Sequence, residues 1–224
     1  MIGRRQVLLG AGAAAFAPAL AAAAPEHRVY ELRIYRMQPG QRDTLVDLFD
    51  RVFVEAHEVL GMRILGTFED LDNPDHLVWL RSFPDMAARG RMLEAFYGGP
   101  VWQANRSAAN ATMIDATDVY LLRPIGNGPP LPPAGHSDDS RATFAVDVHA
   151  LTPANLRAAR RTSPFAALET EPSPNNFPRL PVRDERVVVL LRRFDAGQSV
   201  PASRGMTEPV RRLRIRPTAR SLLR

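Results

Sequence analysis

Alternating polar side chains near the start of the chain are the first feature that could do chemistry. In the segment "RVYELRIYRM", residues 28–37, Glu31, Arg33 and Tyr35 alternate with apolar residues. Successive side chains of a β-strand point to opposite faces, so these three side chains share one face. A carboxylate, a guanidinium and a phenol held together in this way can orient a small anionic or aromatic molecule on an apolar lining.

The direction of this polar face depends on where the apolar face packs. If Leu32 and Ile34 pack against helices, the polar side chains project into the barrel that the strand helps to build. The same parity argument applies to strands later in the chain. The predicted inward set is Glu31, Arg33, Tyr35, Trp79, Arg81, Asp147 and His149. This set forms either a ligand site or a network of internal salt bridges, because buried charges must be paired.

A short helical segment carries the other candidate ligand-binding residues. Trp102 and Arg106 lie one helical turn apart. In a functional interpretation the segment is a lid over one barrel mouth. Tyr97 and Trp102 then stack on a ligand, Arg106 binds an anion and Asn110 holds a carbonyl group. In a structural interpretation Trp102 anchors the core, Arg106 pairs with a carboxylate and Asn110 fixes the turn into the next strand.

Two histidines are candidate general bases. His149 shares the predicted inward direction, and His57 lies at the edge of an amphipathic helix, one turn after Phe53. No two histidines share a metal-ligand spacing, and the chain has no phosphate-binding or nucleophile motif. It has no cysteine and no lysine, which excludes thiolate and Schiff-base chemistry. We therefore expect no metal and no cofactor.

The order of predicted elements in the first half is strand, helix, strand, strand, helix, strand. The helix covers residues 45–60, where apolar residues recur at helical spacing, and a Gly-Gly-Pro sequence at residues 98–100 divides the second helical region. This order is that of a ferredoxin-like unit. We place this unit at residues 28–124.

The second half resembles a reduced copy of the first. A Gly/Pro-rich linker spans residues 125–140, and residues 141–224 repeat the strand, proline turn, helix and further strands without the second helical region. Two such halves can close into a barrel with helices outside. The sequence thus predicts an α+β fold of tandem ferredoxin-like halves, the second degenerate. Two independent small domains are the alternative.

The start of the chain predicts export. Residues 1–23 have a basic start, an apolar stretch and a run of small residues, as in a secretory signal peptide cleaved after Ala23. Arg4 and Arg5 resemble the twin-arginine export motif, which gives a periplasmic location in a bacterium. An ordinary export leader and an uncleaved anchor are the alternatives. After cleavage we expect no stable membrane span.

The overall charge argues against nucleic-acid binding. The formal net charge of the 224-residue chain is only +5, and its arginines are scattered among carboxylates. A hydrophobic content of 45% is typical of a globular protein.

Several segments in the first half resemble one family. "YELRIYRMQPGQ", "GMRILGTFEDLDNPDHLVWLRSFPDMAARGRMLEAFYGGPVW" and "ANATMIDATDVYLLRP" resemble a bacterial NIPSNAP protein of the dimeric α+β barrel superfamily. The resemblance covers about residues 28–124 and implies a barrel fold and a homodimer. The family has no settled catalytic activity, and some relatives carry a histidine where this chain has Asn105. The wider superfamily includes cofactor-free monooxygenases, isomerases and haem-binding enzymes, so fold does not fix function.

The resulting interpretation is an exported NIPSNAP-type barrel that binds a small apolar or aromatic molecule. If it is an enzyme, the resemblance favours a cofactor-independent oxygenase or isomerase. His149 or His57 would then be the base, and Arg33, Arg81 or Arg106 would stabilise an oxyanion. The alternative is a non-catalytic interaction or structural module, with the arginine-rich "RRLRIR" strand and the Trp102 helix forming contacts.

Overall fold

The computed structural model describes residues 26–126, 129, 142–162, 164–195, 198–200 and 202–223. The predicted signal peptide and most of the predicted linker lie outside these residues. The first half contains β1 (Val29–Met37), α1 (Arg42–Leu48), η1 (Phe49–Phe53), α2 (Val54–Val59), β2 (Arg63–Asp70), β3 (His76–Phe83), α3 (Met86–Gly98), α4 (Pro100–Ala111) and β4 (Met113–Pro124). The second half contains β5 (Thr143–Ala150), α5 (Pro153–Arg161), β6 (Ala166–Thr170), β7 (Val187–Phe194) and β8 (Arg211–Pro217).

Local sequence explains where these helices begin and end. The Asp85 carboxylate accepts the Ala88 backbone N–H and caps α3, and Pro100 opens α4 where its missing N–H costs nothing. The predicted long helix before β2 is three consecutive pieces, because a π-helical turn, η1, separates α1 from α2. Gly61 ends it with a φ of 88°. None of the helices in the described part of the chain is long and apolar enough to cross a membrane.

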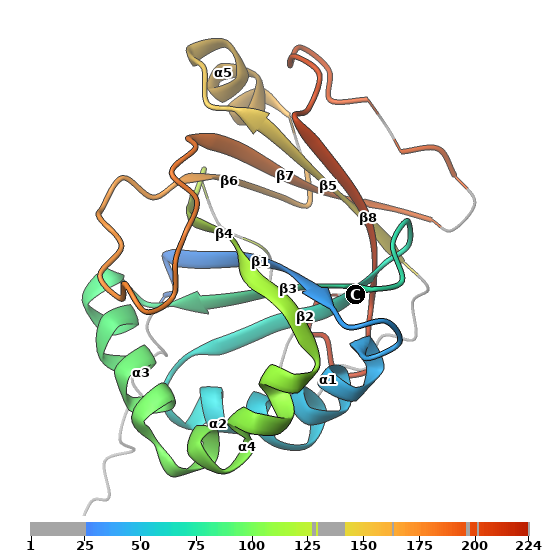
Figure 1. Cartoon of the computed structure of the whole chain (residues 1–224). Coiled ribbons are helices and arrows are strands. Elements are labelled where there is room, and N and C mark those ends of the chain that lie inside the picture. The colour runs from blue at the N-terminus through green and yellow to red at the C-terminus, as the bar shows by residue number, and fades with distance from the viewer. Residues whose placement is uncertain are drawn as a thin grey trace, which may run out of the picture.

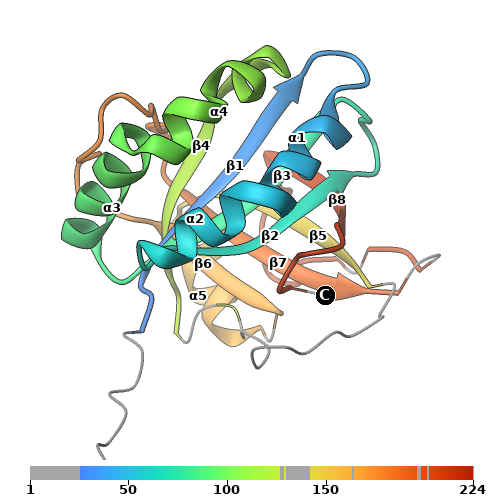
Figure 2. The ribbon, with the colours of Figure 1, turned by 90° about the horizontal axis from the view of Figure 1, so that it is seen from below.

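The eight strands close into one barrel in the order β1-β3-β2-β8-β5-β7-β6-β4. Each half contributes a four-stranded antiparallel sheet with ferredoxin-like order, and the halves are joined where β2 pairs with β8 and β4 pairs with β6. Helices α1 to α4 cover the outside of the first sheet, and α5 covers part of the second (Figures 1 and 2). The predicted fold class is confirmed. The alternative of two independent domains is wrong.

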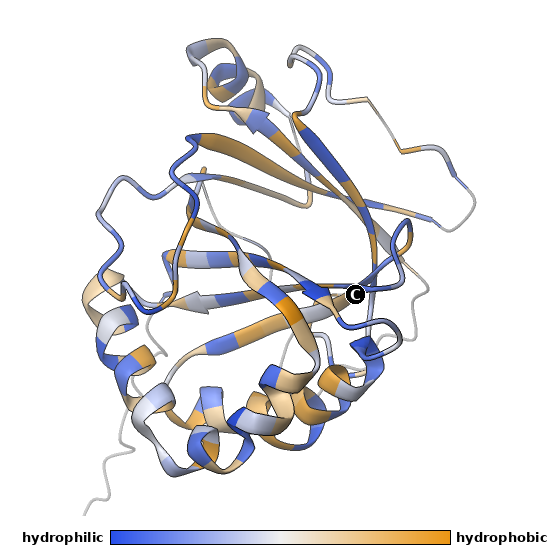
Figure 3. Ribbon diagram, viewed as in Figure 1, coloured by the Kyte–Doolittle hydropathy of each residue, from blue (hydrophilic) through white to orange (hydrophobic). Residues whose placement is uncertain are grey.

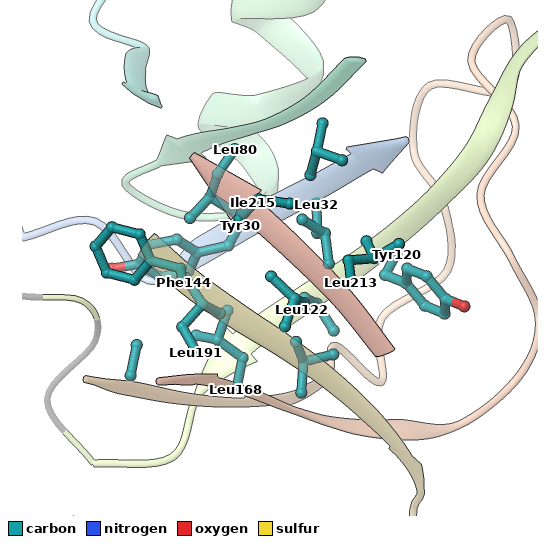
Figure 4. Close-up of a cluster of buried hydrophobic side chains, with 14 of the residues drawn as sticks. Tyr30, Leu32, Leu80, Tyr120, Leu122, Phe144, Leu168, Leu191, Leu213 and Ile215 are labelled. Carbon is teal, nitrogen blue, oxygen red and sulfur yellow. The ribbon is translucent and has the colours of Figure 1, made fainter. Parts of the chain in front are cut away.

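Apolar side chains fill the interior of the barrel. Tyr30, Leu32, Val146, Leu168 and Leu191 belong to a cluster of twenty buried residues, most of them on the eight strands (Figure 4). Hydropathy alternates along the strands accordingly (Figure 3). An eight-stranded barrel encloses just enough room for its own side chains, so apolar residues from both halves complete one core.

A second apolar layer lies outside the barrel, between the first sheet and its helices. Tyr35, Trp79, Phe49, Phe53 and Phe96 belong to this layer. The predicted inward direction of the polar residues is therefore wrong. The residues concerned are Glu31, Arg33, Tyr35, Trp79, Arg81, Asp147 and His149, which alternate with the interior residues and so lie on the outer faces.

The physical reason is that β1 is buried on both faces. Alternation of polar and apolar residues shows which side chains share a face but not which face turns inward. Apolar side chains fill the interior of this barrel and offer no partner for a charge, whereas the helix-covered face can bring charged partners from helices and loops. The predicted ligand site inside the barrel is accordingly replaced by a packed apolar core.

Candidate functional site

A buried polar cluster lies between the first sheet and its helices. We call it the Glu31 cluster, after its central carboxylate. Its members are Glu31, Arg33 and Tyr35 on β1, Trp79 and Arg81 on β3, His57 on α2 and Arg89 on α3. Glu31, Arg33, Arg81 and Arg89 have no exposed surface at all. The strands bring these residues together because Glu31 and Arg81 are directly opposite in the β1–β3 pairing.

Glu31 is held by three guanidinium groups. Its Oε2 atom accepts hydrogen bonds from Arg33 Nη1 at 2.7 Å and Arg81 Nε at 2.8 Å, and its Oε1 atom accepts one from Arg89 Nε at 2.7 Å. The Nη2 atoms of Arg81 and Arg89 lie 2.6 and 2.7 Å from the same carboxylate. The predicted salt bridges of Glu31 with Arg33 and Arg81 therefore exist, but beneath the helices instead of inside the barrel, and Asp147 is not part of this network.

Aromatic groups surround the cluster, and burial and the arginine charges fix the protonation of its members. Arg33 Nε donates to the Tyr35 hydroxyl at 2.9 Å, and the guanidinium carbons of Arg33 and Arg81 lie 5.4 and 5.1 Å from the Trp79 ring. Burial raises the pKa of Tyr35, so its phenol is neutral. Burial opposes ionisation of Glu31, but the charges of Arg81, Arg33 and Arg89 hold its pKa well below the usual range.

His57 is a neutral imidazole in this cluster. Its Nδ1 atom lies 2.7 Å from the Phe53 carbonyl oxygen, which can only accept, so Nδ1 carries the proton. Its Nε2 atom faces Arg81 Nη1 at 3.4 Å. Burial, and then the charge of Arg81, lower the pKa of His57 from 6.5 to about 3. A group with this pKa is a weak general base at neutral pH, which argues against the predicted catalytic role of His57.

Replacing His57 with asparagine tests this burial. The pKa of His57 is lowered in the folded state, so the unfolded state binds more protons between pH 6.5 and about 3 and stability falls as the pH drops through this window. Between pH 7 and pH 5 the free energy of unfolding of wild type is expected to fall by about 2 kcal/mol more than that of His57→Asn, because the difference grows by about 1.4 kcal/mol per pH unit. Urea unfolding at several pH values measures this difference. Parallel stability curves for the two proteins would contradict the buried neutral imidazole.

The loop between β6 and β7 closes one side of the Glu31 cluster. Arg89 Nη1 donates to the side-chain oxygens of Asn175 and Asn176 at 3.0 and 2.7 Å. Phe177 stacks on Tyr97 with ring centroids 5.8 Å apart. This loop descends from the second half onto α3 (Figure 1). A Cβ atom at Gly90 would lie 2.9 Å from Asn176 Nδ2, so glycine permits the close approach.

The Trp102 segment is part of the outer layer and does not cover a barrel mouth. The Trp102 ring packs against Phe53, Phe96 and Tyr97, with centroids 5.9, 5.9 and 4.9 Å away. Arg106 and Asn110 are exposed on α4. The structural interpretation of Trp102 fits these contacts, and the proposed lid does not.

A second polar cluster lies on the outer face of the second half. Asp147 accepts hydrogen bonds from Arg212 Nε at 2.6 Å and Ser203 Oγ at 2.9 Å, and it pairs with Arg192. Burial opposes ionisation of Asp147, but the hydrogen bonds and charges of these partners hold its pKa below the usual range. His149 is buried beside this group, with Nδ1 2.9 Å from the Thr207 carbonyl oxygen, and burial lowers its pKa. We call this group the Asp147 cluster.

The two clusters occupy equivalent places in the two halves. In the first half Glu31 lies opposite Arg81 and Arg33 opposite Trp79. In the second half Ala145 lies opposite Arg192 and Asp147 opposite Leu190. The arginine on the third strand of each half is kept, while the carboxylate moves two residues along the first strand. Each half thus neutralises an arginine on its outer face in its own way.

A pocket adjoins the Asp147 cluster, where the described residues of the second half contain no counterpart of α3 and α4. The pocket has a volume of about 520 Å³. Its lining comes from the end of α5, β7 and the segment before β8: Thr162, Pro164, Phe165, Leu190, Arg192, Arg193, Ala202, Ser203 and Arg204. Arg192 Nε and Nη1 are buried without a hydrogen-bond partner among the described residues. The pocket therefore combines an apolar wall with guanidinium groups.

Several residues of the two clusters were not predicted from the sequence. Arg89 lies on the stripe of α3 that also buries Leu93 and Phe96. An arginine at helical spacing on an apolar stripe is a sequence signal that could have indicated a buried charge. Arg192 shares a face with Val188 and Leu190 on β7 and could have been found by parity. The contributions of Asn175 and Ser203 come from loops and carry no periodic signal.

The arginines of β8 are paired with carboxylates from other parts of the chain. Arg211 pairs with Asp118, Arg214 with Asp72 and Arg216 with Glu69. Arg212 pairs with Asp147. These pairs weaken the alternative in which the "RRLRIR" strand presents free charges to a partner.

The fold and the two outer-face clusters define a single-chain α+β barrel protein made of tandem ferredoxin-like halves. Residues 30–128 match the NIPSNAP family model. None of the curated proteins matches the chain. No group of side chains in the described residues has the composition of a metal site.

Solved structures are similar to one half of the chain or to both. A NIPSNAP-like domain protein from Burkholderia xenovorans is 25% identical, with 51% of this chain and 99% of that chain covered and a TM-score of 0.43. A NIPSNAP family protein from Agrobacterium tumefaciens is 18% identical, with 45% and 89% covered and a TM-score of 0.41. A proposed monooxygenase from Fusobacterium nucleatum is 5% identical, with 86% and 93% covered and a TM-score of 0.51. The last shares the fold across both halves.

Proposed function

We propose that this protein is an exported binding protein for a small organic anion, with the ligand in the pocket beside the Asp147 cluster. The observation that carries this proposal is the pocket itself, in which an apolar wall adjoins Arg192, two of whose nitrogen atoms make no hydrogen bond among the described residues. Its volume of about 520 Å³ lies in the range of small-molecule sites. The sequence predicts a small apolar or aromatic molecule inside the barrel; the proposed ligand adds a negative charge to such an apolar body, and its site moves outside the barrel.

The pocket lining favours a carboxylate with an apolar body. Phe165 and Leu190 offer apolar surface, and the Arg192 guanidinium, which binds Asp147 through Nη2, belongs to the same lining and can bind a carboxylate. Arg204 adds positive charge at the same pocket. Asp147 fixes the position of Arg192 through an ion pair. Its single negative charge is shared with Arg212, so it does not neutralise the whole basic lining.

The arrangement favours binding over catalysis. An oxygenase or isomerase of the predicted kind needs a base beside its substrate. His57 and His149 do not occur among the described residues that line the pocket. Burial also lowers the pKa of both imidazoles. Neither histidine is therefore placed to remove a proton from a molecule bound there.

Filling the pocket tests the proposal. Benzoate and phenylacetate are expected to bind wild type at least about 10-fold more tightly than benzamide, because a charged hydrogen bond contributes about 1.5–3 kcal/mol. Ala202→Trp, at the pocket lining, is expected to abolish carboxylate binding. Ala108→Trp, on an exposed face of α4, is the matched control and should bind as wild type does. Isothermal titration calorimetry measures all three. Equal binding by the two tryptophan variants would rule out this pocket.

Export and assembly belong to the same proposal. The twin-arginine-like leader supports export, and the expected mature chain begins at Ala24. The barrel closes within one chain, so the predicted homodimer would join barrel exteriors and is not needed to complete the fold. Native mass spectrometry of protein from the periplasm reports the cleavage site, the number of chains and any retained organic acid. An uncleaved mass would contradict export by this route.

A further inference from the structure

The Glu31 cluster carries more positive than negative charge. Among the described residues it contains three arginines, Arg33, Arg81 and Arg89, and one carboxylate, Glu31, all with no exposed surface. Buried charges are costly unless they are paired. A surplus of two positive charges under the helices is therefore a feature that needs an explanation.

Titration does not relieve this surplus. Arginine does not lose its proton in proteins, so the three guanidinium groups stay charged. His57 and Tyr35 are neutral and add no negative charge. The remaining partners of the arginines are neutral oxygens, from Tyr35, Asn175 and Asn176, and the faces of aromatic rings. These groups stabilise the cations but do not balance them.

Two buried donors in the cluster have no hydrogen-bond partner among the described residues. They are Arg33 Nη2 and Trp79 Nε1; Arg81 Nη2 and Arg89 Nη2 also make no hydrogen bond of good geometry, but they lie 2.6 and 2.7 Å from the Glu31 carboxylate and pair with it. The side chains are neighbours: Arg33 and Trp79 are directly opposite in the β1–β3 pairing, and the Arg33 guanidinium carbon lies 5.4 Å from the Trp79 ring centroid. An unmade hydrogen bond at a buried donor is expensive, so two adjacent donors point to a common acceptor.

We propose that the Glu31 cluster binds one small monovalent anion, of the size of chloride or formate, through Arg33 Nη2 and Trp79 Nε1. The anion accepts from the two unpaired donors and offsets part of the surplus charge. Its size is limited because the surrounding side chains are fully buried and packed beneath the helices and the β6–β7 loop. This site is distinct from the pocket in the second half, and it stabilises the first half instead of serving as the ligand site.

Anion-specific thermal stability tests the proposal. Mature protein is unfolded in sodium gluconate, whose anion is too large for the site, with increasing replacement by sodium chloride, bromide or formate at constant ionic strength. The small anions are expected to raise the melting temperature by about 5–10 °C at saturation, as for a ligand at about 100 times its Kd. Equal melting temperatures in all four salts would overturn the proposal.

Variants assign the effect to this cluster. Arg33→Met keeps the length of the side chain but removes the donor, and it is expected to lose the difference between chloride and gluconate. Ala202→Trp blocks the other pocket and should keep the full chloride effect, which separates this proposal from the proposed function. A chloride effect that persists in Arg33→Met, or disappears in Ala202→Trp, would place the anion elsewhere.

A fluorescence measurement covers the case in which Arg33→Met does not fold. The chain has two tryptophans, so Trp102→Phe leaves Trp79 as the only indole. Bromide is expected to quench Trp79 with a saturating dependence and with the same midpoint as its effect on the melting temperature. Quenching that rises linearly with bromide, or no quenching, would show that the anion does not reach Trp79 Nε1.

Discussion

Replacing Glu31 with glutamine is expected to lower the free energy of unfolding by about 3–5 kcal/mol, because breaking a buried ion pair leaves uncompensated charge. Glu31 contacts Arg33, Arg81 and Arg89 at once, and none of the four residues is exposed. Glutamine keeps the shape but removes the charge, so three guanidinium groups remain with no carboxylate among the cluster residues. Urea unfolding measures the loss, and a chain that fails to fold at 37 °C is the extreme form of the same result.

An exposed ion pair provides the matched control. Glu94 and Arg179 lie 3.0 Å apart with more than half of each side chain exposed. Glu94→Gln is the same chemical change in water, so its expected cost is about 0–1 kcal/mol. If Glu31→Gln cost no more than Glu94→Gln, the buried network could not be a main source of stability. Small anions should partly rescue Glu31→Gln, because the proposed anion site lies in the same cluster.

Replacing Phe144 with alanine is expected to lower the free energy of unfolding by about 3–5 kcal/mol, the range for truncating a large buried aromatic side chain. Phe144 lies in the barrel interior with no exposed surface, and its ring centroid is 6.1 Å from Phe68 and 5.0 Å from Phe165 (Figure 4). Strands of both halves surround it, so a cavity there cannot be closed by one half alone. The midpoint of chemical unfolding should fall with little change in its slope.

An exposed apolar residue controls for this truncation. Ile114 on β4 is about half exposed, so Ile114→Ala removes apolar surface that is already in water. Its expected cost is within about 0.5 kcal/mol. A cost for Phe144→Ala as small as that of Ile114→Ala would show that the barrel interior is loosely filled and would restore the interior as a ligand site.

The two halves use the same architecture for different purposes. The first half covers its outer face with five helical pieces, from α1 to α4 with η1 among them, and buries the Glu31 cluster beneath them. The second half has only α5 on that face, and the pocket lies where further helices are missing from the described residues. The β6–β7 loop of the second half then helps to close the first, through Asn175 and Asn176 on Arg89. This asymmetry gives each half its own kind of site.

Much of the fold could be predicted from the sequence. Period-two alternation identified β1, the Gly-Gly-Pro break separated α3 from α4, and the repeated strand–proline–helix pattern indicated β5, α5 and two related halves. The candidate site was predicted in composition but not in place. Glu31, Arg33, Trp79 and Arg81 do lie together, as the parity argument required, but on the other side of the sheet.

The sequence by itself determined which side chains share a face, because backbone periodicity is local. Only the tertiary structure decided which face turns inward, since β1 is buried on both sides and the choice depends on how eight strands fill one closed interior. It also decided which distant segments come into contact. Arg89 binds Asn175, and Asp147 binds both Arg192 and Ser203. Such contacts depend on the path of loops, and loops carry no periodic pattern from which their position in space can be calculated.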